Sequence, residues 1–115
     1  MALYGIYGRH EIKDCPLNSS ESRKIVLDIE NKNKDSDVCA DYKINKVIGR
    51  YHSGLEHTLV WVVRTSRPHD LEEFTIELGV ARWNDLKFVP ERTFADVITD
   101  VTAIHGLQEW EPGDE

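Results

Sequence analysis

The chain has 115 residues, of which 40% are hydrophobic and 30% charged, and this composition predicts one globular domain. Its formal net charge of -7 argues against a nucleic-acid partner, because binding to phosphates needs a positive surface. The sequence has no apolar run long enough to span a bilayer, no basic flank of a signal peptide and only two cysteines, so we expect no membrane contact and a reduced, cytoplasmic protein.

The first half of the chain predicts a strand, a helix, a loop and a second strand. Residues 2–10 are rich in the aromatic and aliphatic side chains that favour a strand. A helix follows, because Asn18 and Glu21 have the spacing of a capping box and apolar residues then recur at helical intervals. The polar segment 33–41 predicts a loop, and residues 42–52 predict the second strand.

The second half of the chain predicts a hairpin partner, a helix, a fourth strand and a final helix. Residues 57–63 follow a short glycine-containing turn and are apolar on both faces, which is typical of a central strand in a covered sheet. A helix is expected to begin at Pro68, because apolar residues recur at helical spacing from Leu71 to Ala81, and Gly79 lies near its plausible end. Residues 85–92 predict a weak edge strand, and residues 93–106 predict a helix that closes the fold.

This order of elements, βαββαβ followed by a helix, predicts a ferredoxin-like α+β fold. Such a fold has an antiparallel four-stranded sheet in the spatial order 4-1-3-2, with helices on one face. Residues 1–106 would form the single domain, and residues 107–115 an acidic C-terminal tail. The other face of the sheet would be bare in a monomer, so we expect a homodimer in which a second subunit covers it.

Four short motifs point to a known family. They are "HEIKDCP" (10–16), Arg23 in the first helix, "EHTLVWVV" (56–63) and "FVPERTF" (88–94). On these motifs the chain resembles a largely uncharacterised family of small ferredoxin-like proteins of the dimeric α+β-barrel type, although "DSDVCADYK" (35–43) lacks the expected glycine-valine step. The wider group includes cofactor-free monooxygenases, haem-degrading enzymes and simple ligand binders. The resemblance therefore implies a fold and a dimer rather than one activity.

The predicted topology brings histidine and cysteine side chains to one edge of the sheet. His10 ends the first strand, His52 ends the second, and His57 begins the third, while Cys15 precedes the helix that starts at the same edge. Imidazole and thiolate donors are typical ligands of zinc, copper or iron, with a position left open for water or substrate. The sequence therefore predicts a transition-metal site formed by His10, Cys15, His57 and His52.

Cys15 has two other interpretations. Its position just before a helix would favour the thiolate, and Cys15 is then the candidate catalytic nucleophile or redox centre. Alternatively it is a small apolar side chain packed under the helix. Two hypotheses for the function follow. One is a homodimer whose His/Cys site binds a metal and acts on a small molecule, and the other is a non-catalytic ligand-binding or interaction module of the same fold.

Overall fold

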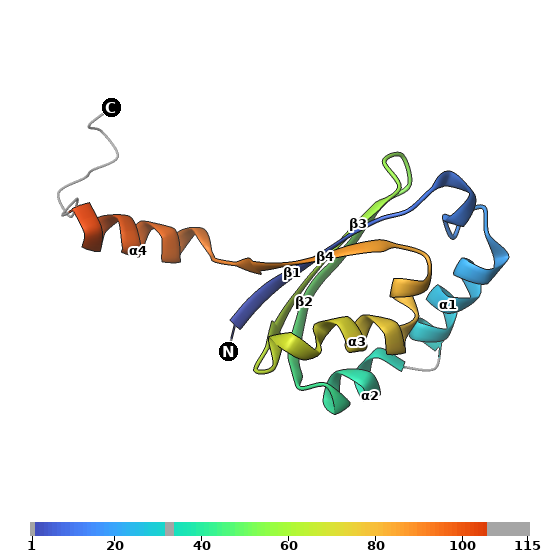
Figure 1. The fold of residues 1–115 in the computed structure, drawn as a ribbon, viewed down its shortest axis with the longest axis horizontal. Helices are drawn as coiled ribbons and strands as arrows, with labels where there is room; N and C mark the ends of the chain where they lie inside the picture. Colours follow the sequence, from blue (N-terminus) through green and yellow to red (C-terminus); the bar gives the residue numbers. More distant parts are fainter. Residues whose placement is uncertain (1, 32–33, 106–115) are drawn as a thin grey trace.

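The computed structural model describes residues 2–31 and 34–105, which contain four strands and four α-helices (Figure 1). In chain order these are β1 (Ala2–Arg9), α1 (Ser20–Asn31), α2 (Lys34–Asp41), β2 (Ile44–Ser53), β3 (Thr58–Thr65), α3 (Leu71–Leu78), β4 (Asp85–Glu91) and α4 (Phe94–His105). Short 3-10 turns occur at Ile12–Asp14, Pro68–Asp70 and Val80–Arg82. The predicted acidic tail lies outside the described residues.

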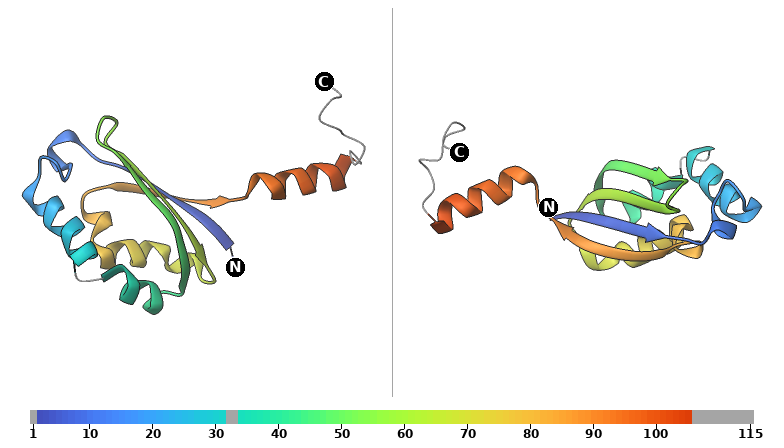
Figure 2. Two further views of the ribbon diagram at one scale, coloured as in Figure 1. Left: turned by 180° about the vertical axis from the view of Figure 1, so that it is seen from behind. Right: turned by 90° about the horizontal axis from the view of Figure 1, so that it is seen from above.

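Antiparallel pairing joins the four strands into one sheet. Their order is β2-β3-β1-β4, which reads 4-1-3-2 from the β4 edge. β3 lies in the interior of the sheet, as its apolar run predicted, and β4, which contains Pro90, forms an edge. Helices α1, α2 and α3 lie together on one side of the sheet (Figures 1 and 2), so the fold is α+β and consistent with the ferredoxin-like pattern.

The core lies between the sheet and these three helices. Every second side chain of β3, from Leu59 to Thr65, is buried on the helix-covered face, and the side chains between them are half-buried. The helices bury an apolar stripe against this face, which stabilises both layers. The buried apolar helix residues are Ile29 of α1, Val38 of α2, and Leu71, Phe74 and Leu78 of α3.

The prediction of a loop over residues 33–41 is wrong, because α2 occupies Lys34–Asp41. The segment is rich in aspartate, asparagine and serine, which favour turns when the local sequence is considered alone. Val38 is only 5% exposed, and Cys39 packs against the same core. Packing of these two side chains provides the tertiary stabilisation that the local propensity lacks.

The start of α1 also differs from the predicted capping box. Ser19, rather than Asn18, caps the helix, since the Ser19 hydroxyl accepts a hydrogen bond from the Ser22 amide at 3.2 Å. The Asn18 side chain instead donates to the carbonyl of Ile12 at 2.8 Å. This bond ties the preceding 3-10 turn to the helix entry and places Cys15 between them.

The predicted final helix is present, but it does not close the fold. α4 follows β4 and projects away from the sheet and the other helices in all three views (Figures 1 and 2). No residue of α4 is buried, and the apolar stripe of the helix is exposed. The helical period correctly predicted this stripe, but a period does not specify what covers it. The stripe consists of Phe94, Val97, Ile98, Val101 and Ile104.

The sheet face opposite helices α1–α3 carries aromatic and aliphatic side chains. Cross-strand pairing places Tyr51, Val60 and Tyr7 in one row, with Tyr51 65% exposed and Tyr7 38% exposed. The two tyrosine rings lie over neighbouring glycines: a Cβ atom on Gly5 would lie 2.6 Å from Cε2 of Tyr7, and one on Gly49 would lie 2.6 Å from Cε2 of Tyr51. Glycine is therefore required at both positions for the rings to lie against the sheet.

Candidate metal centre

His10 and His57 meet where β1 ends and β3 begins. Arg9 pairs with Thr58 in the antiparallel register, so the next residue of each strand is brought to the same edge. The His10 amide donates a hydrogen bond to the His57 carbonyl at 3.0 Å, which extends the ladder by one step. The two imidazole centroids lie 5.6 Å apart at an interplanar angle of 77°. The predicted convergence of these two histidines is confirmed.

The backbone of His57 is in the left-handed region, with a φ of 55°. Few residues other than glycine adopt this conformation, and it persists where the surrounding structure holds it. Here the hydrogen bond from His10 and the pairing of the next residue, Thr58, fix the position of the backbone. The half-buried imidazole of His57 is therefore held at the end of the hairpin, beside His10.

Cys15 reaches the same place from the segment between β1 and α1. Pro16 restricts the residue before it to extended conformations, and Cys15 has a ψ of 136°. The Cys15 carbonyl accepts hydrogen bonds from the amides of Asn18 and Ser19, both at 2.8 Å. The residue is 3% exposed. The conformation of the segment is thus fixed on both sides of a buried thiol.

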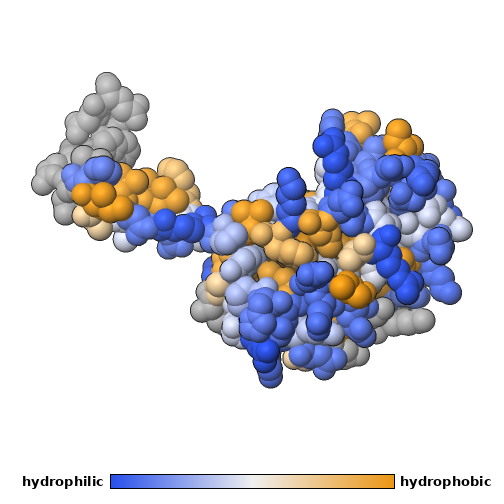
Figure 3. Space-filling view, in the orientation of Figure 1, coloured by the Kyte–Doolittle hydropathy of each residue, from blue (hydrophilic) through white to orange (hydrophobic). Residues whose placement is uncertain are grey.

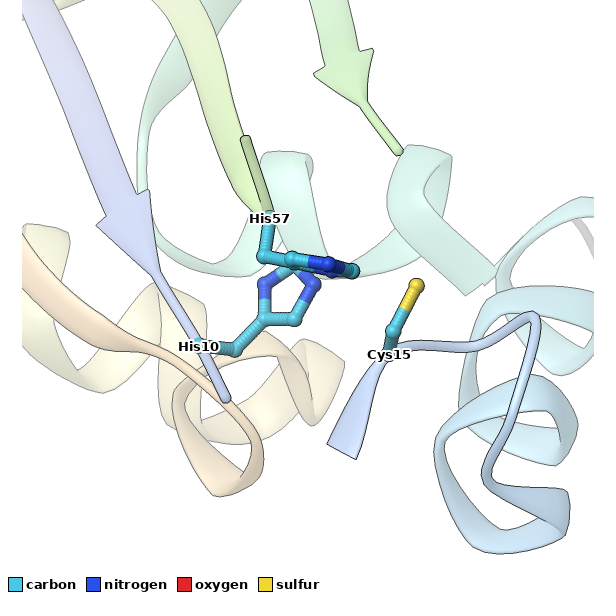
Figure 4. Close-up of side chains that lie close together, drawn as sticks. All are labelled: His10, Cys15 and His57. Atoms are coloured by element: carbon cyan, nitrogen blue, oxygen red, sulfur yellow. The ribbon is translucent and has the colours of Figure 1, made fainter. Parts of the chain in front are cut away.

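These three side chains form a group with the composition of a metal site (Figure 4). One candidate donor atom from each of His10, Cys15 and His57 lies within 4.8 Å of the other two. Donors around a tetrahedral zinc ion are separated by roughly 3.3–3.6 Å, from the usual Zn–N and Zn–S bond lengths. The 4.8 Å limit is wider than this separation, so metal binding would draw the three donors closer together.

Asn84 selects the tautomer of the neutral His10 ring. The Asn84 amide nitrogen donates to the Val80 carbonyl at 3.1 Å, so the Asn84 oxygen faces Nδ1 of His10 as an acceptor, 2.8 Å away. Nδ1 of His10 therefore carries the proton, and Nε2 presents a lone pair. Metal-binding histidines characteristically donate their other ring N–H to such an acceptor.

Two imidazole nitrogens in this group are buried without a hydrogen-bond partner. Within residues 2–31 and 34–105, no group pairs with Nε2 of His10 or with Nδ1 of His57. Buried polar atoms are nearly always paired in folded proteins, so these two nitrogens are candidate positions for a bound ligand, ion or water. Both atoms belong to residues of the candidate metal group.

His52, the fourth predicted ligand, lies outside the group. It faces the helix-covered side of β2, where its Nε2 accepts a hydrogen bond from the indole N–H of Trp61 at 3.1 Å. Burial lowers the pKa of His52 below its ordinary value of 6.5, and the nearby His10 and Arg50 lower it further. His52 is therefore held as a neutral imidazole beside the group.

A pocket of about 260 Å³ adjoins the candidate metal group. His10 and Cys15 line it together with His52, and most of the remaining wall is apolar, from Pro16 and Val26 among others. A larger hollow, of about 700 Å³, lies elsewhere, between α1 and α3, and none of the three candidate donors lines it. We therefore take the smaller pocket as the one relevant to the site.

Sequence reasoning missed Asn84 and Trp83. Asn84 sets the His10 tautomer, and the Trp83 ring contacts His10 edge-on at a centroid distance of 4.9 Å. Both residues lie just before β4, far from His10 in sequence, and no local motif links them to it. The predicted strand order, which sets the fourth strand beside the first, is the sequence signal that could have placed Asn84 near His10; in the structure Arg9 pairs with Asp85.

The remaining histidines and the second cysteine lie away from the site. His69 is exposed and lies within 3.5 Å of an Asp70 carboxylate oxygen, and His105 ends the projecting helix α4. Cys39 packs against the core on α2. The site therefore includes two of the five histidines and one of the two cysteines in the sequence.

The comparisons with known proteins assign no class to this site. No family model and no curated protein matches the chain. Among the described helices, none has the length and apolar character needed to cross a membrane.

Proposed function

We propose that the protein binds one transition-metal ion through His10, Cys15 and His57. The observation that carries this proposal is the pair of buried, unpartnered imidazole nitrogens beside a buried cysteine sulfur, with donors within 4.8 Å of one another. Leaving one buried polar atom unpaired costs about 1–3 kcal/mol, and bonds to a metal would remove this cost for both nitrogens.

The donor set favours zinc. Calcium and magnesium take oxygen ligands, whereas two imidazoles and one thiolate suit zinc, with copper and iron as competitors for the same donors. Three protein ligands leave one position of a tetrahedron for water or for a bound molecule. With one thiolate among the ligands, a divalent ion would keep one net positive charge, which would attract a donor of negative charge.

The adjacent pocket supports binding of a small molecule at that open position. Two of the proposed ligands, His10 and Cys15, line the pocket, and its other walls are largely apolar. Its volume of about 260 Å³ is below the usual range for drug-sized ligands. We propose that the bound molecule is small and mostly apolar, with one group that coordinates metal. A zinc ion so placed acts as a Lewis acid toward such a group.

Metal analysis of protein purified without a polyhistidine tag tests the proposal. We expect about one zinc ion per chain, and after removal of zinc by a chelator we expect cobalt(II) to bind with the intense visible absorption of a tetrahedral site. A thiolate-to-cobalt charge-transfer band would identify Cys15 as a ligand. If the protein treated with chelator took up no zinc, cobalt or copper, the metal site would be ruled out.

Matched variants locate the site. The Cys15→Ser substitution is expected to abolish the charge-transfer band. The Cys39→Ser substitution, which changes the other cysteine, should leave the band intact. His57→Gln should lower the affinity for cobalt, whereas the exposed His69→Gln should not. Equal effects of the site variant and its control would contradict the assignment.

We also propose that the protein is a homodimer, in which the second copy covers the open face of the sheet. The row of aromatic and aliphatic side chains on that face supports this proposal. Measuring the mass of the particle in solution tests it, since the chain mass is 13.3 kDa. A particle of that mass at all concentrations would contradict the dimer.

A further inference from the structure

α4 carries an apolar surface that needs a partner. Its stripe of five apolar residues is exposed along the helix, from Phe94 (80%) to Ile104 (74%), and no residue of the helix is buried. Figure 3 shows the hydrophobic side chains gathered on the projecting arm. An isolated helix of this length is marginal in water, because most helical stability in proteins comes from packing of an apolar face. Among the residues that the structure describes, no surface buries the stripe of α4.

The open face of the sheet offers a complementary surface. Its central row is formed by Tyr51, Val60 and Tyr7, and Val62 and Val89 follow in the next row. Twelve helical residues extend for about 18 Å, and four strands span about 14 Å from the first to the last. A helix laid across the strands would thus cover the apolar band from one edge of the sheet to the other.

The charges of the two surfaces favour this pairing over direct packing of two sheets. Four cationic residues and two acidic residues point to the open face, so that face is net positive although the chain carries -7. The apolar stripe of α4 carries no lysine or arginine, and Asp96 and Asp100 lie on the side of the helix away from it, where Asp100 pairs with Arg92. Two open faces would therefore meet with the same sign of charge, whereas the stripe of α4 brings no cation to the open face. The residues on the face are Arg9, Lys46, Arg64, Lys87, Asp85 and Glu91.

We infer that α4 of one chain docks across the open sheet face of a second copy, and that the exchange is reciprocal. In the described part of each chain, the helix stripe and the open sheet face are both exposed, and two copies related by a two-fold axis would cover both surfaces. The dimer is closed, and it is independent of metal at the His10 site. The exchanged arm replaces the face-to-face sheet contact expected of a dimeric α+β barrel.

A pair of substitutions on one helix tests the role of the stripe. Val101→Asp places a charge in the stripe, whereas Ala103→Asp places the same charge on the opposite side of α4. By analytical ultracentrifugation we expect the unmodified chain and Ala103→Asp to sediment as dimers, and Val101→Asp to shift to the chain mass of 13.3 kDa. Dimers of equal stability in all three proteins would overturn the inference, as would a monomeric unmodified chain.

Cross-linking then distinguishes the docked helix from the other ways of forming a dimer. Chains carrying Ile98→Cys are mixed with chains carrying Val60→Cys and treated with a short bifunctional thiol reagent, with the unmodified chain as the control for native cysteines. We expect covalent dimers that contain one chain of each kind. Cross-linking of Val60→Cys chains only to each other would indicate sheet-to-sheet packing, and that of Ile98→Cys chains only to each other would indicate paired arms. Either result overturns the inference.

Discussion

Asn84 decides which nitrogen of His10 is available to a metal. Its side-chain oxygen accepts from Nδ1 of His10, and its nitrogen is anchored on the Val80 carbonyl, so the amide cannot reverse without losing both bonds. A buried amide with both ends engaged is a rigid support for the imidazole. The metal proposal thus depends on a residue that is not itself a ligand.

We predict that Asn84→Leu lowers zinc affinity about 10–100-fold, the usual effect of removing an acceptor behind a metal-binding histidine. Asn84→Asp keeps an acceptor for His10 and should bind zinc more tightly than Asn84→Leu. Competition with a chromophoric chelator measures both affinities, and urea unfolding of the metal-free variants separates affinity from loss of folding. Unchanged affinity in a folded Asn84→Leu protein would contradict the role of Asn84.

His52 should make the stability of the protein sensitive to mild acid. Its pKa is lowered from 6.5 in the folded state by burial first, and then by His10 and Arg50. Below pH 6.5 the His52 side chain is protonated in the unfolded chain, whereas in the folded chain it stays neutral down to its lower pKa. The free energy of unfolding therefore falls as the pH drops toward the folded-state pKa. His52→Gln keeps an acceptor for Trp61 and removes the titrating group.

We therefore predict that the metal-free unmodified protein loses more stability between pH 7 and pH 5 than His52→Gln does. Urea unfolding at a series of pH values measures the difference, and a chelator prevents metal from contributing. His69→Gln, which alters an exposed histidine, should follow the unmodified protein. Parallel curves for the unmodified protein and His52→Gln would show that His52 does not cause the pH dependence.

The sequence predicted those site residues whose positions follow from the order of the strands and helices. His10 and His57 lie at facing ends of antiparallel strands, so the order of elements was enough to bring them together. Cys15 follows from the same order, because the connection from β1 to α1 starts at that edge. The roles of His52 and Asn84 depend on which hydrogen bonds their side chains make, and no pattern in the sequence specifies these bonds.

At the scale of elements, Gly79 fixes the end of α3. It has a φ of 92°, and its amide reaches the carbonyls of Thr75 and Ile76, which closes the last turn of the helix. A Cβ atom at this position would lie 2.8 Å from Cγ2 of Ile25 on α1. Both the conformation and the close approach to α1 therefore require glycine.

We predict that Gly79→Ala lowers the free energy of unfolding by about 1–3 kcal/mol, through strain at positive φ and displacement of Ile25. Gly54→Ala is the matched control, because a Cβ atom there would approach only Leu17, at 3.4 Å. Equilibrium unfolding in urea compares the two variants. If Gly54→Ala were the more destabilised protein, this account of Gly79 would be wrong.

The elements show what hydrophobic periodicity determines and what it leaves open. β3 was predictable because a short, valine-rich apolar run after a glycine-containing turn is typical of an interior strand. α2 was missed because its composition favours turns, and burial of Val38 is a tertiary effect. The stripe of α4 was predictable from the helical spacing of its apolar residues. This spacing does not specify which surface the stripe packs against.

On the scale of the whole molecule, the proposed metal centre and the proposed dimer contact lie in separate regions. The proposed metal centre lies at the edge where β1 ends and β3 begins, whereas α4 leaves from the end of β4, which pairs beside the start of β1. The proposed dimer contact uses the open face, and the pocket lies on the helix-covered side. Substitutions in one region should therefore leave the other intact, which allows the two proposals to be tested separately.

Folding must pair β1 with β3 before the metal centre can exist. His10 and His57 come from distant parts of the sequence, and contacts of this kind carry a high cost in chain entropy, so they slow folding. A register slip of one residue between the two strands would turn the side chains of one strand to the other face. Only chains in which β1 and β3 pair in the native register would therefore bind the metal ion. Binding would favour that register over the slipped ones.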